Sequence, residues 1–218
     1  MHFPKAGGTS IRGTLAHAFS PADLLLDYDD DPADPDCLKW TAPGSYESNK
    51  PTTLRARCVH GHFRPDKYDR IDGSRVVMLR HPVDTMLSIY FFWLQLADTD
   101  YTGHRLFETF RSERPSILQL AAFPTLRRLM SHTYFGGYDM ANFSAIGDHA
   151  NREPYFAWIE EAMDVHVQRD IVDNVTVQTE QRDAAHSDLA LRAQMSILLA
   201  DDVSFYERWA GTFRSMPG

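Results

Sequence analysis

The sequence predicts an α/β fold, a three-layer sandwich with a mainly parallel central sheet, in a single domain over residues 1–218. Two observations carry this prediction. The run Val76-Val77-Met78-Leu79 has no polar residue, which is typical of a strand buried on both faces of a parallel sheet. Strand-like segments also alternate with longer segments of helical periodicity, as they do in α/β domains. A chain of 218 residues with 43% hydrophobic residues is long enough for one packed core.

The first elements are a short strand at residues 2–4, a glycine turn at residues 6–8 and a helix from Thr9 or Ser10. Ser and Thr are favoured helix N-caps, so these two residues indicate where the helix begins. Apolar residues recur every four positions after them and predict one buried helix face, formed by Ile11, Leu15 and Phe19.

Residues 20–53 are rich in Asp, Pro, Gly and Ser and predict an irregular excursion at the surface. They contain the acidic run Asp27-Tyr28-Asp29-Asp30-Asp31. This run lacks the ligand spacing, the central Gly and the terminal Glu of an EF-hand loop. A solvated acidic loop is therefore favoured over a calcium site.

The remaining segments supply further strands and helices. A strand over residues 54–59 precedes His60-Gly61-His62, and a strand over residues 75–79 precedes Pro82. Proline is well suited to the first position of a helix, which here is expected to extend over residues 83–96. A last strand is expected at residues 175–179. Further helices are expected at residues 104–111, 116–130, 154–169, 187–200 and 203–213.

Charge and composition exclude several classes of protein. The formal net charge of -8 disfavours nucleic acid and anionic lipid as partners. Two cysteines are too few for a disulfide framework and lack the spacing of a zinc site, which favours a reducing compartment. No stretch has the roughly 18 apolar residues of a membrane helix, and no cleavable leader is recognisable. We therefore expect a cytoplasmic protein, unless a membrane anchor precedes Met1.

The segment from His2 to Ser10 combines a strand end, a lysine, two glycines and two hydroxyl residues at a helix start. Glycines allow backbone N–H groups to approach a ligand, a helix N-terminus attracts an anion, and Lys5 adds a full positive charge. The pattern predicts a phosphate-binding loop. A glycine turn with an incidental lysine is the alternative.

This loop differs from a Walker A motif, in which the lysine follows the glycines and a neighbouring hydroxyl binds magnesium. Here Lys5 precedes Gly7 and Gly8. The strand at residues 75–79 is followed by Arg80, where a magnesium-dependent nucleotide hydrolase of this layout has an aspartate. Both differences indicate a phosphate group that is bound without magnesium.

Arg80 and Ser88 form a second candidate site. Arg80 ends a strand and Ser88 lies on the second turn of the next helix, so a guanidinium and a hydroxyl can converge on one dianionic phosphate. Alternatively, Arg80 pairs with a carboxylate and Ser88 is only a buried helix residue.

His60 and His62 form a third candidate site, because they share one side of the chain if this segment is extended. Such a pair can ligate a metal, form a structural contact or supply a catalytic base. By itself the pair favours the structural interpretation. No recognised spacing supplies the further ligands that a metal needs.

The motifs resemble those of a known family. His-Phe-Pro-Lys-Ala-Gly-Gly-Thr-Ser resembles the 5′-phosphosulfate loop of the carbohydrate-type sulfotransferases, usually written His-x-Pro-Lys-x-x-Gly-Thr-Ser/Thr. The segment that begins with Leu79-Arg80-His81-Pro82 and includes Ser88 resembles the family's 3′-phosphate motif. Val59-His60-Gly61-His62-Phe63 resembles the catalytic region of uronosyl 2-O-sulfotransferases.

The resemblance implies a P-loop-like fold and transfer of a sulfuryl group from 3′-phosphoadenosine-5′-phosphosulfate, without a metal. The acceptor would be a hydroxyl of a saccharide or small molecule. His62 would be the general base, His60 an assisting residue, and Lys5 the group that stabilises the leaving phosphate. The residues that would bind the donor are Lys5, Ala6, Gly7, Gly8, Thr9, Ser10, Arg80 and Ser88.

Two other functions stay open. A P-loop kinase or nucleotide hydrolase would need the Walker A Lys-Ser/Thr pair and the strand-end Asp, which are missing. A non-catalytic nucleotide-binding protein would not need His62 beside Lys5.

The sequence does not identify the acceptor, since each group of residues that could bind it has an alternative explanation. A saccharide groove or a solvated helix face would explain Arg105, Arg111, Arg114, Arg127 and Arg128, and sugar stacking or core packing would explain Tyr134, Phe135 and Tyr138.

Overall fold

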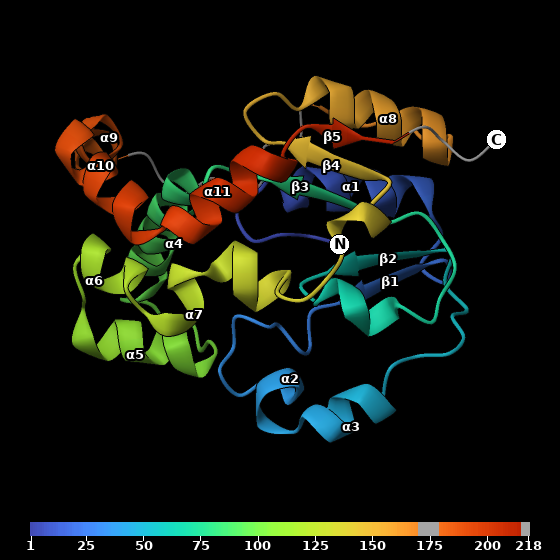
Figure 1. Cartoon of the computed structure of the whole chain (residues 1–218), viewed down its shortest axis with the longest axis horizontal. Helices are drawn as coiled ribbons and strands as arrows, with labels where there is room; N and C mark the ends of the chain where they lie inside the picture. The colour runs from blue at the N-terminus through green and yellow to red at the C-terminus, as the bar shows by residue number, and fades with distance from the viewer. Residues whose placement is uncertain (170–178, 215–218) are drawn as a thin grey trace.

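The computed structural model describes residues 1–169 and 179–214, and it shows a mixed α/β fold with two small sheets (Figure 1). The first sheet pairs β1 (Leu24–Asp27) with β2 (Cys58–Gly61) in parallel. In the second, β4 (Ala145–Asp148) lies between β3 (Val76–Leu79), which is parallel to it, and β5 (Thr212–Phe213), which is antiparallel. Parallel pairs therefore predominate, as predicted, and the hydrogen-bonded strands form two sheets.

The start of the chain lies between the two sheets. The Met1 amine donates to the Val76 carbonyl at 3.1 Å, and the His2 N–H donates to the Gly61 carbonyl at 2.8 Å. With these contacts residues 1–3 bridge β2 and β3 without forming the strand predicted at residues 2–4. A hollow of about 180 Å³ adjoins Met1 between the start of β2 and the start of β3. Burial lowers the pKa of the Met1 amine from 8.0 to about 6.

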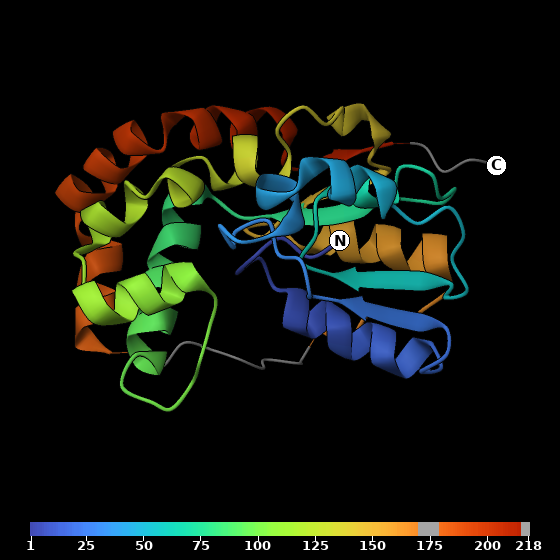
Figure 2. The same ribbon diagram turned by 90° about the horizontal axis from the view of Figure 1, so that it is seen from below.

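Two long helices, α1 (Gly8–Ala18) and α8 (Glu153–Met163), pack against one face of the strands. Figure 2 shows α1 on the opposite side of the strands from α11 (Ala200–Trp209). The apolar face predicted for the first helix is confirmed: Ile11 and Leu15 are buried, and Phe19 packs against the same cluster. Met78 of β3 and Ala145 of β4 contribute the strand side of this core.

A larger group of helices covers the other face, with the largely buried α4 (Pro82–Leu96) at its centre. Val77 and Leu79 point into this core, so β3 is buried on both faces as predicted. The helix predicted after Pro82 is also confirmed. Within the described ranges, no helix is long and apolar enough to cross a membrane. The group also includes α5 (Arg105–Glu113), α6 (Ile117–Ala121), α7 (Pro124–Arg127), the π-helix η2 (Leu129–Tyr134), α9 (Glu180–Ser187) and α10 (Leu189–Leu198).

The excursion predicted at residues 20–53 is more ordered than expected. It contributes β1 and two short helices, α2 (Leu38–Thr41) and α3 (Pro43–Ser48). Asp27, the first residue of the acidic run, is buried at the end of β1. Its carboxylate pairs with Lys67 at 2.7 Å and accepts from the Tyr68 hydroxyl at 2.8 Å. The prediction of a solvated loop is wrong here, because the 3-10 turn η1 (Pro65–Tyr68) supplies these partners.

Other boundaries differ from those predicted. β2 begins at Cys58, later than residues 54–59 suggested. The helix predicted at residues 116–130 is divided, because Pro124 lacks an N–H and keeps Phe123 out of the helical conformation. α8 ends at Met163 because Asp164 adopts a left-handed conformation. β4, η3 (Met140–Asn142) and α9 are not predicted by the sequence. The strand predicted at residues 175–179 lies outside the described residues, apart from Thr179.

Candidate functional site

The predicted phosphate-binding loop forms the turn before α1. Gly7 occupies the N-cap with a φ of 81°, a left-handed conformation that glycine adopts without strain. α1 therefore begins at Gly8, and Thr9 and Ser10 lie in its first turn, not at the N-cap as predicted. The first backbone N–H groups of a helix have no partner within the helix, and together with the helix dipole they favour an anion.

Lys5 and Gly8 are in close contact with side chains outside the turn. Lys5 has a φ of 59°, which is uncommon for a residue with a side chain and indicates backbone strain. Its ammonium lies 4.0 Å from the centre of the Phe92 ring on α4. A Cβ atom on Gly8 would lie 1.9 Å from His2 Nε2, so only glycine fits beside this imidazole. Ala6, between the two, is buried.

Arg80 brings the second motif to the first. It follows β3 directly, and its Nη1 donates to the Lys5 carbonyl at 3.0 Å. Ser88 lies in the second turn of α4, with 6% of its surface exposed. Arg80 and Ser88 thus lie before and within the same helix, and their joint contact with one phosphate stays a prediction.

Positive charges gather at this loop. Burial, with smaller contributions from Arg80 and Arg182, lowers the pKa of Lys5 from 10.5 to about 8. Burial and Arg182 also lower the pKa of Arg80, whereas Asp84 opposes that shift. The Asp84 carboxylate is itself engaged by Arg192 at 2.7 Å. The charges of Arg80 and Arg182 repel that of Lys5, which favours the binding of an anion beside them.

His62, in the third motif, has a hydrogen-bond partner for each ring nitrogen. Its Nδ1 lies 2.9 Å from Oδ2 of Asp31, and its Nε2 lies 3.1 Å from Nδ1 of His2. Because the His2 ring also packs against Gly8, the third motif is joined to the phosphate-binding loop. The three motifs predicted from the sequence are therefore in contact.

His60 has different surroundings, since it lies within β2 and only 3% of its surface is exposed. Its Nδ1 lies 3.0 Å from the Tyr28 hydroxyl, and its ring stacks on His2 at a centroid distance of 5.2 Å. Burial, followed by the N-terminus and His62, lowers the pKa of His60 from 6.5 to about 3. His60 is thus a neutral residue that supports His2. In residues 1–169 and 179–214, no group of three or more His, Cys, Asp or Glu side chains is arranged to hold a metal ion.

Asp31 is not marked by any sequence pattern as a site residue. Its carboxylate accepts from the Ala33 N–H at 2.8 Å and from the Tyr134 hydroxyl, in addition to its contact with His62. Burial raises the pKa of Asp31, but the bonds from His62, Tyr134 and Ala33 outweigh burial and lower it overall. Asp31 is therefore ionised near neutral pH and held from two sides, so it can orient His62.

Arg64 fixes the segment that carries Tyr134. Its Nη1 donates to the carbonyls of His132 at 3.0 Å and Thr133 at 2.7 Å, and its Nη2 donates to the Gly136 carbonyl. This buried guanidinium satisfies carbonyl groups at the end of η2. The position of Tyr134, and through it that of Asp31, therefore depends on the residues that follow β2.

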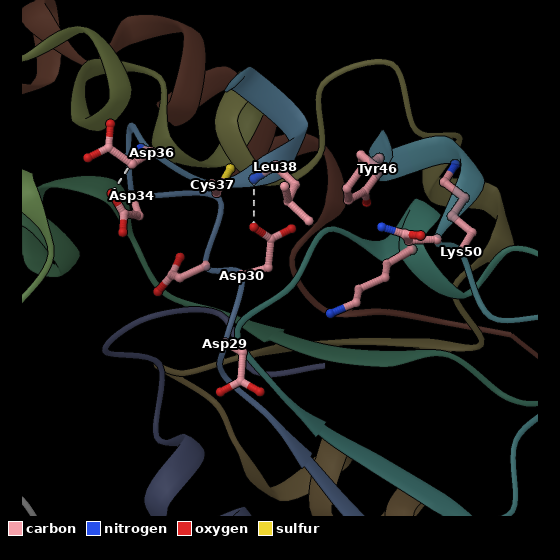
Figure 3. A pocket seen from close by; sticks show the side chains of 11 residues that line it. Asp29, Asp30, Asp34, Asp36, Cys37, Leu38, Tyr46 and Lys50 are labelled. Carbon is pink, nitrogen blue, oxygen red and sulfur yellow. Dashed lines mark hydrogen bonds between the residues drawn. The ribbon is translucent and has the colours of Figure 1, made fainter. Parts of the chain in front are cut away.

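A hollow of about 470 Å³ opens beside Asp31 (Figure 3). Besides Asp31, two of its carboxylates bind the local backbone, since Asp30 accepts from the Leu38 N–H at 2.7 Å and Asp34 accepts from the Asp36 N–H at 3.0 Å. Negative charge predominates in the lining, which comprises Asp29, Asp30, Asp31, Asp34, Asp36, Cys37, Leu38, Tyr46, Asn49, Lys50 and Lys67.

For the residues that were candidates for acceptor binding, the structure favours core packing over sugar stacking and local pairing over a saccharide groove. Tyr134 and Phe135 are buried in the core, so they do not form a surface for sugar stacking. The side chain of Arg127 donates to the Leu198 carbonyl at 3.3 Å. Other arginines pair with nearby carboxylates: Arg105 with Asp36, Arg111 with Glu108 and Arg114 with Asp98.

Comparison with known proteins identified no relative of this chain. No protein-family model matches the chain, and neither a curated protein nor a solved structure matches it significantly. The candidate site therefore rests on its own geometry: a loop beside which Lys5 and Arg80 lie, joined through His2 to a histidine that a carboxylate holds in place.

Proposed function

We propose that the chain is a sulfotransferase that moves a sulfuryl group from 3′-phosphoadenosine-5′-phosphosulfate to a hydroxyl of a small or saccharide acceptor. One observation supports this most strongly: the three sequence motifs meet at the start of α1. Arg80 bonds the Lys5 carbonyl, and His2 lies between Gly8 and His62. A cation cluster suited to a phosphosulfate is thus next to a histidine suited to an acceptor hydroxyl.

We also infer that the two sheets belong to one P-loop-like three-layer sandwich. Helices pack on both faces of β3, and the phosphate-binding loop connects the bridge at residues 1–3 with α1. The bridge is parallel to β3. The Met1 amine donates to the Val76 carbonyl and the Arg80 side chain donates to the Lys5 carbonyl, and the residues of both pairs are 75 positions apart, as they are when two segments align in the same direction. The bridge therefore occupies the place of a central parallel strand between β2 and β3.

In the proposed reaction, the N–H groups at residues 7–10 and Lys5 bind the 5′-phosphosulfate, and Arg80 and Ser88 bind the 3′-phosphate. The acceptor oxygen forms a bond to sulfur, and the bond from sulfur to the bridging phosphate oxygen breaks in line with it. Lys5 stabilises the charge that develops on that oxygen as the bisphosphate leaves. His62, oriented by Asp31, is the base on which the proton of the acceptor hydroxyl ends.

The acceptor proposed here is uncharged or cationic. The hollow beside Asp31 is lined by carboxylates, and a polyanionic saccharide would be repelled from it. D-glucose, D-glucosamine and benzyl alcohol are suitable first probes, because they offer a hydroxyl and carry no negative charge.

The test of the donor assignment is a comparison of ligand-induced stabilisation. Adenosine 3′,5′-bisphosphate without metal is expected to stabilise the fold by about 2.7 kcal/mol at a hundredfold excess over its dissociation constant. ATP with magnesium is expected to have a much smaller effect at the same concentration, because the loop lacks a Walker A arrangement. Thermal unfolding with each ligand measures the difference.

An equal or larger effect of ATP with magnesium would reject the sulfotransferase in favour of the P-loop kinase or hydrolase. Stabilisation by the bisphosphate without transfer of ³⁵S label from the donor to any of the three probes would favour a non-catalytic nucleotide-binding protein. The two results separate the alternatives that the sequence leaves open.

Replacement of Arg80 or Ser88 by alanine is expected to weaken binding of the bisphosphate by different amounts. A hydrogen bond to a charged group contributes about 1.5–3 kcal/mol and a neutral one about 0.5–1.5 kcal/mol, so Arg80→Ala should weaken binding more than Ser88→Ala. Isothermal titration measures both. Ser112→Ala, on the exposed end of α5, is a matched control. A variant that binds like the parent protein would remove that residue from the 3′-phosphate site.

A further inference from the structure

We propose that His2 is the first proton acceptor of the reaction, at the end of a relay formed by Asp31, His62 and His2. This inference rests on the proposed function and extends it to a residue that the sequence marks only as part of the phosphate-binding loop. The distances that define the relay are 2.9 Å from Asp31 to His62 and 3.1 Å from His62 to His2.

The position of each proton along the relay follows from the number of hydrogen bonds that each group can donate and accept. The ionised Asp31 carboxylate can only accept, so Nδ1 of His62 carries a proton and donates it. A neutral imidazole has one donor and one acceptor, which leaves Nε2 of His62 as an acceptor. Nδ1 of His2 must then be the donor in the 3.1 Å contact. By the same rule, Nε2 of His2 carries the free electron pair at the end of the relay.

This last nitrogen faces the loop that binds the donor. A Cβ atom on Gly8 would lie 1.9 Å from Nε2 of His2, so the nitrogen is adjacent to the first residue of α1. Nε2 of His62, in contrast, points at His2 and is occupied by it. In the proposed reaction the acceptor hydroxyl approaches the phosphosulfate at the start of α1, on the side of Nε2 of His2.

The proton transfers balance without a further reactant. The acceptor hydroxyl gives its proton to Nε2 of His2 while its oxygen forms the bond to sulfur. The proton on Nδ1 of His2 passes to Nε2 of His62, which becomes an imidazolium beside the Asp31 carboxylate. The bond from sulfur to the phosphate oxygen breaks, and its electron pair stays on the leaving bisphosphate near Lys5.

The surroundings of His2 explain why the positive charge of the accepted proton should not remain on its ring. Burial lowers the pKa of His2 well below 6.5, and His62, His60, the N-terminus and Lys5 lower it further. His60 stacks on the ring at 5.2 Å and supplies no negative charge. His62 instead contacts the Asp31 carboxylate, which stabilises an imidazolium. The relay moves the proton from a buried ring near the Lys5 ammonium to a ring beside an anion.

The proton order can be measured on the resting protein, with neither donor nor acceptor present. Long-range ¹H–¹⁵N correlation spectra of protein labelled with ¹⁵N-histidine distinguish protonated from bare ring nitrogens. We expect Nδ1 to be protonated and Nε2 to be bare in both His62 and His2. Spectra of His2→Asn and His62→Ala assign the signals. A proton on Nε2 of His2 in the parent protein would overturn the relay.

The role of His2 in turnover is tested with His2→Asn. The asparagine nitrogen is bonded to Cγ, as Nδ1 is, so it keeps a donor for His62 but has no second nitrogen to accept a proton. We expect transfer from ³⁵S-labelled donor to the three probes to fall by about 10²–10⁴. His17→Asn, an exposed histidine on α1, is the control and should transfer like the parent protein.

The double variant His2→Asn/His62→Ala should lose no more activity than His62→Ala alone, because residues that act as one unit are not additive. Normal transfer by His2→Asn would show that His2 only positions His62, and would reject the proposal. A parent protein that binds the bisphosphate but labels none of the three probes would reject the proposed function and the relay together. An active parent protein with the other proton order would reject the relay alone.

Discussion

Replacement of His62 by alanine is expected to reduce sulfuryl transfer by about 10²–10⁴ and to leave binding of the bisphosphate almost unchanged. His62 contacts Asp31 and His2, whereas Arg80 contacts the Lys5 carbonyl in the part of the site that we propose for the donor. A base acts on the proton of the acceptor, so its loss affects the transition state and not the bound donor. Single-turnover transfer from ³⁵S-labelled donor measures the first effect, and isothermal titration measures the second.

Lys5→Ala serves as the contrasting variant. The ammonium meets the phosphosulfate in the bound state and still more as charge develops on the leaving oxygen, so both affinity and turnover should fall. Equal turnover in the parent protein and His62→Ala would remove the base assignment. Loss of bisphosphate binding in a folded His62→Ala protein would instead place His62 in the donor site.

A loss of stability on acidification is the second large effect that we expect. The pKa of His60 is 6.5 in the unfolded chain and about 3 in the folded protein, because burial disfavours the imidazolium. Between these values the unfolded state binds the proton and the folded state does not, so stability falls as pH falls from 6.5 towards 3. Each pH unit in this window corresponds to about 1.4 kcal/mol, and the whole window to about 4–5 kcal/mol. Burial also lowers the pKa of His149, to about 4, which adds an effect of the same sign.

Urea unfolding at about pH 7.5 and about pH 4.5 measures this change. His60→Asn removes the titrating group but keeps a side-chain amide that can bond Tyr28, so its free energy of unfolding should depend less steeply on pH. His17→Asn, which replaces an exposed histidine, should retain the slope of the parent protein. A parent protein whose stability is the same at both pH values would show that protonation of His60 is not coupled to unfolding.

A helix or strand could be predicted where its own residues show a clear pattern, such as an apolar run or a proline at a helix start. Elements whose residues show no such pattern could not be predicted. β3 consists of four consecutive apolar residues, and α4 begins at a proline. β4 consists of Ala-Ile-Gly-Asp, and its Gly147 is required because a Cβ atom there would lie 2.5 Å from the Tyr155 ring. That requirement exists only once α8 has packed on the strand. β1 escapes prediction because it lies in an Asp-rich stretch and exposes Leu25 and Leu26.

The same distinction applies to the candidate site. The phosphate-binding loop and Arg80 are recognisable because the residues of each motif are neighbours in the sequence. Asp31 lies 31 residues from His62 and 103 residues from Tyr134, so its role appears only when the fold brings the three side chains together. Arg182 of α9 reaches the loop at Lys5 by packing in the same way. Sequence reasoning identified the residues that we propose to bind the donor and missed those that we propose to orient the base.

The position of the Met1 amine between β2 and β3 has a practical consequence. An affinity tag fused before Met1 would begin beside the hollow between these strands and close to the candidate site. The fused segment would be a structural part of the molecule, not an inert handle.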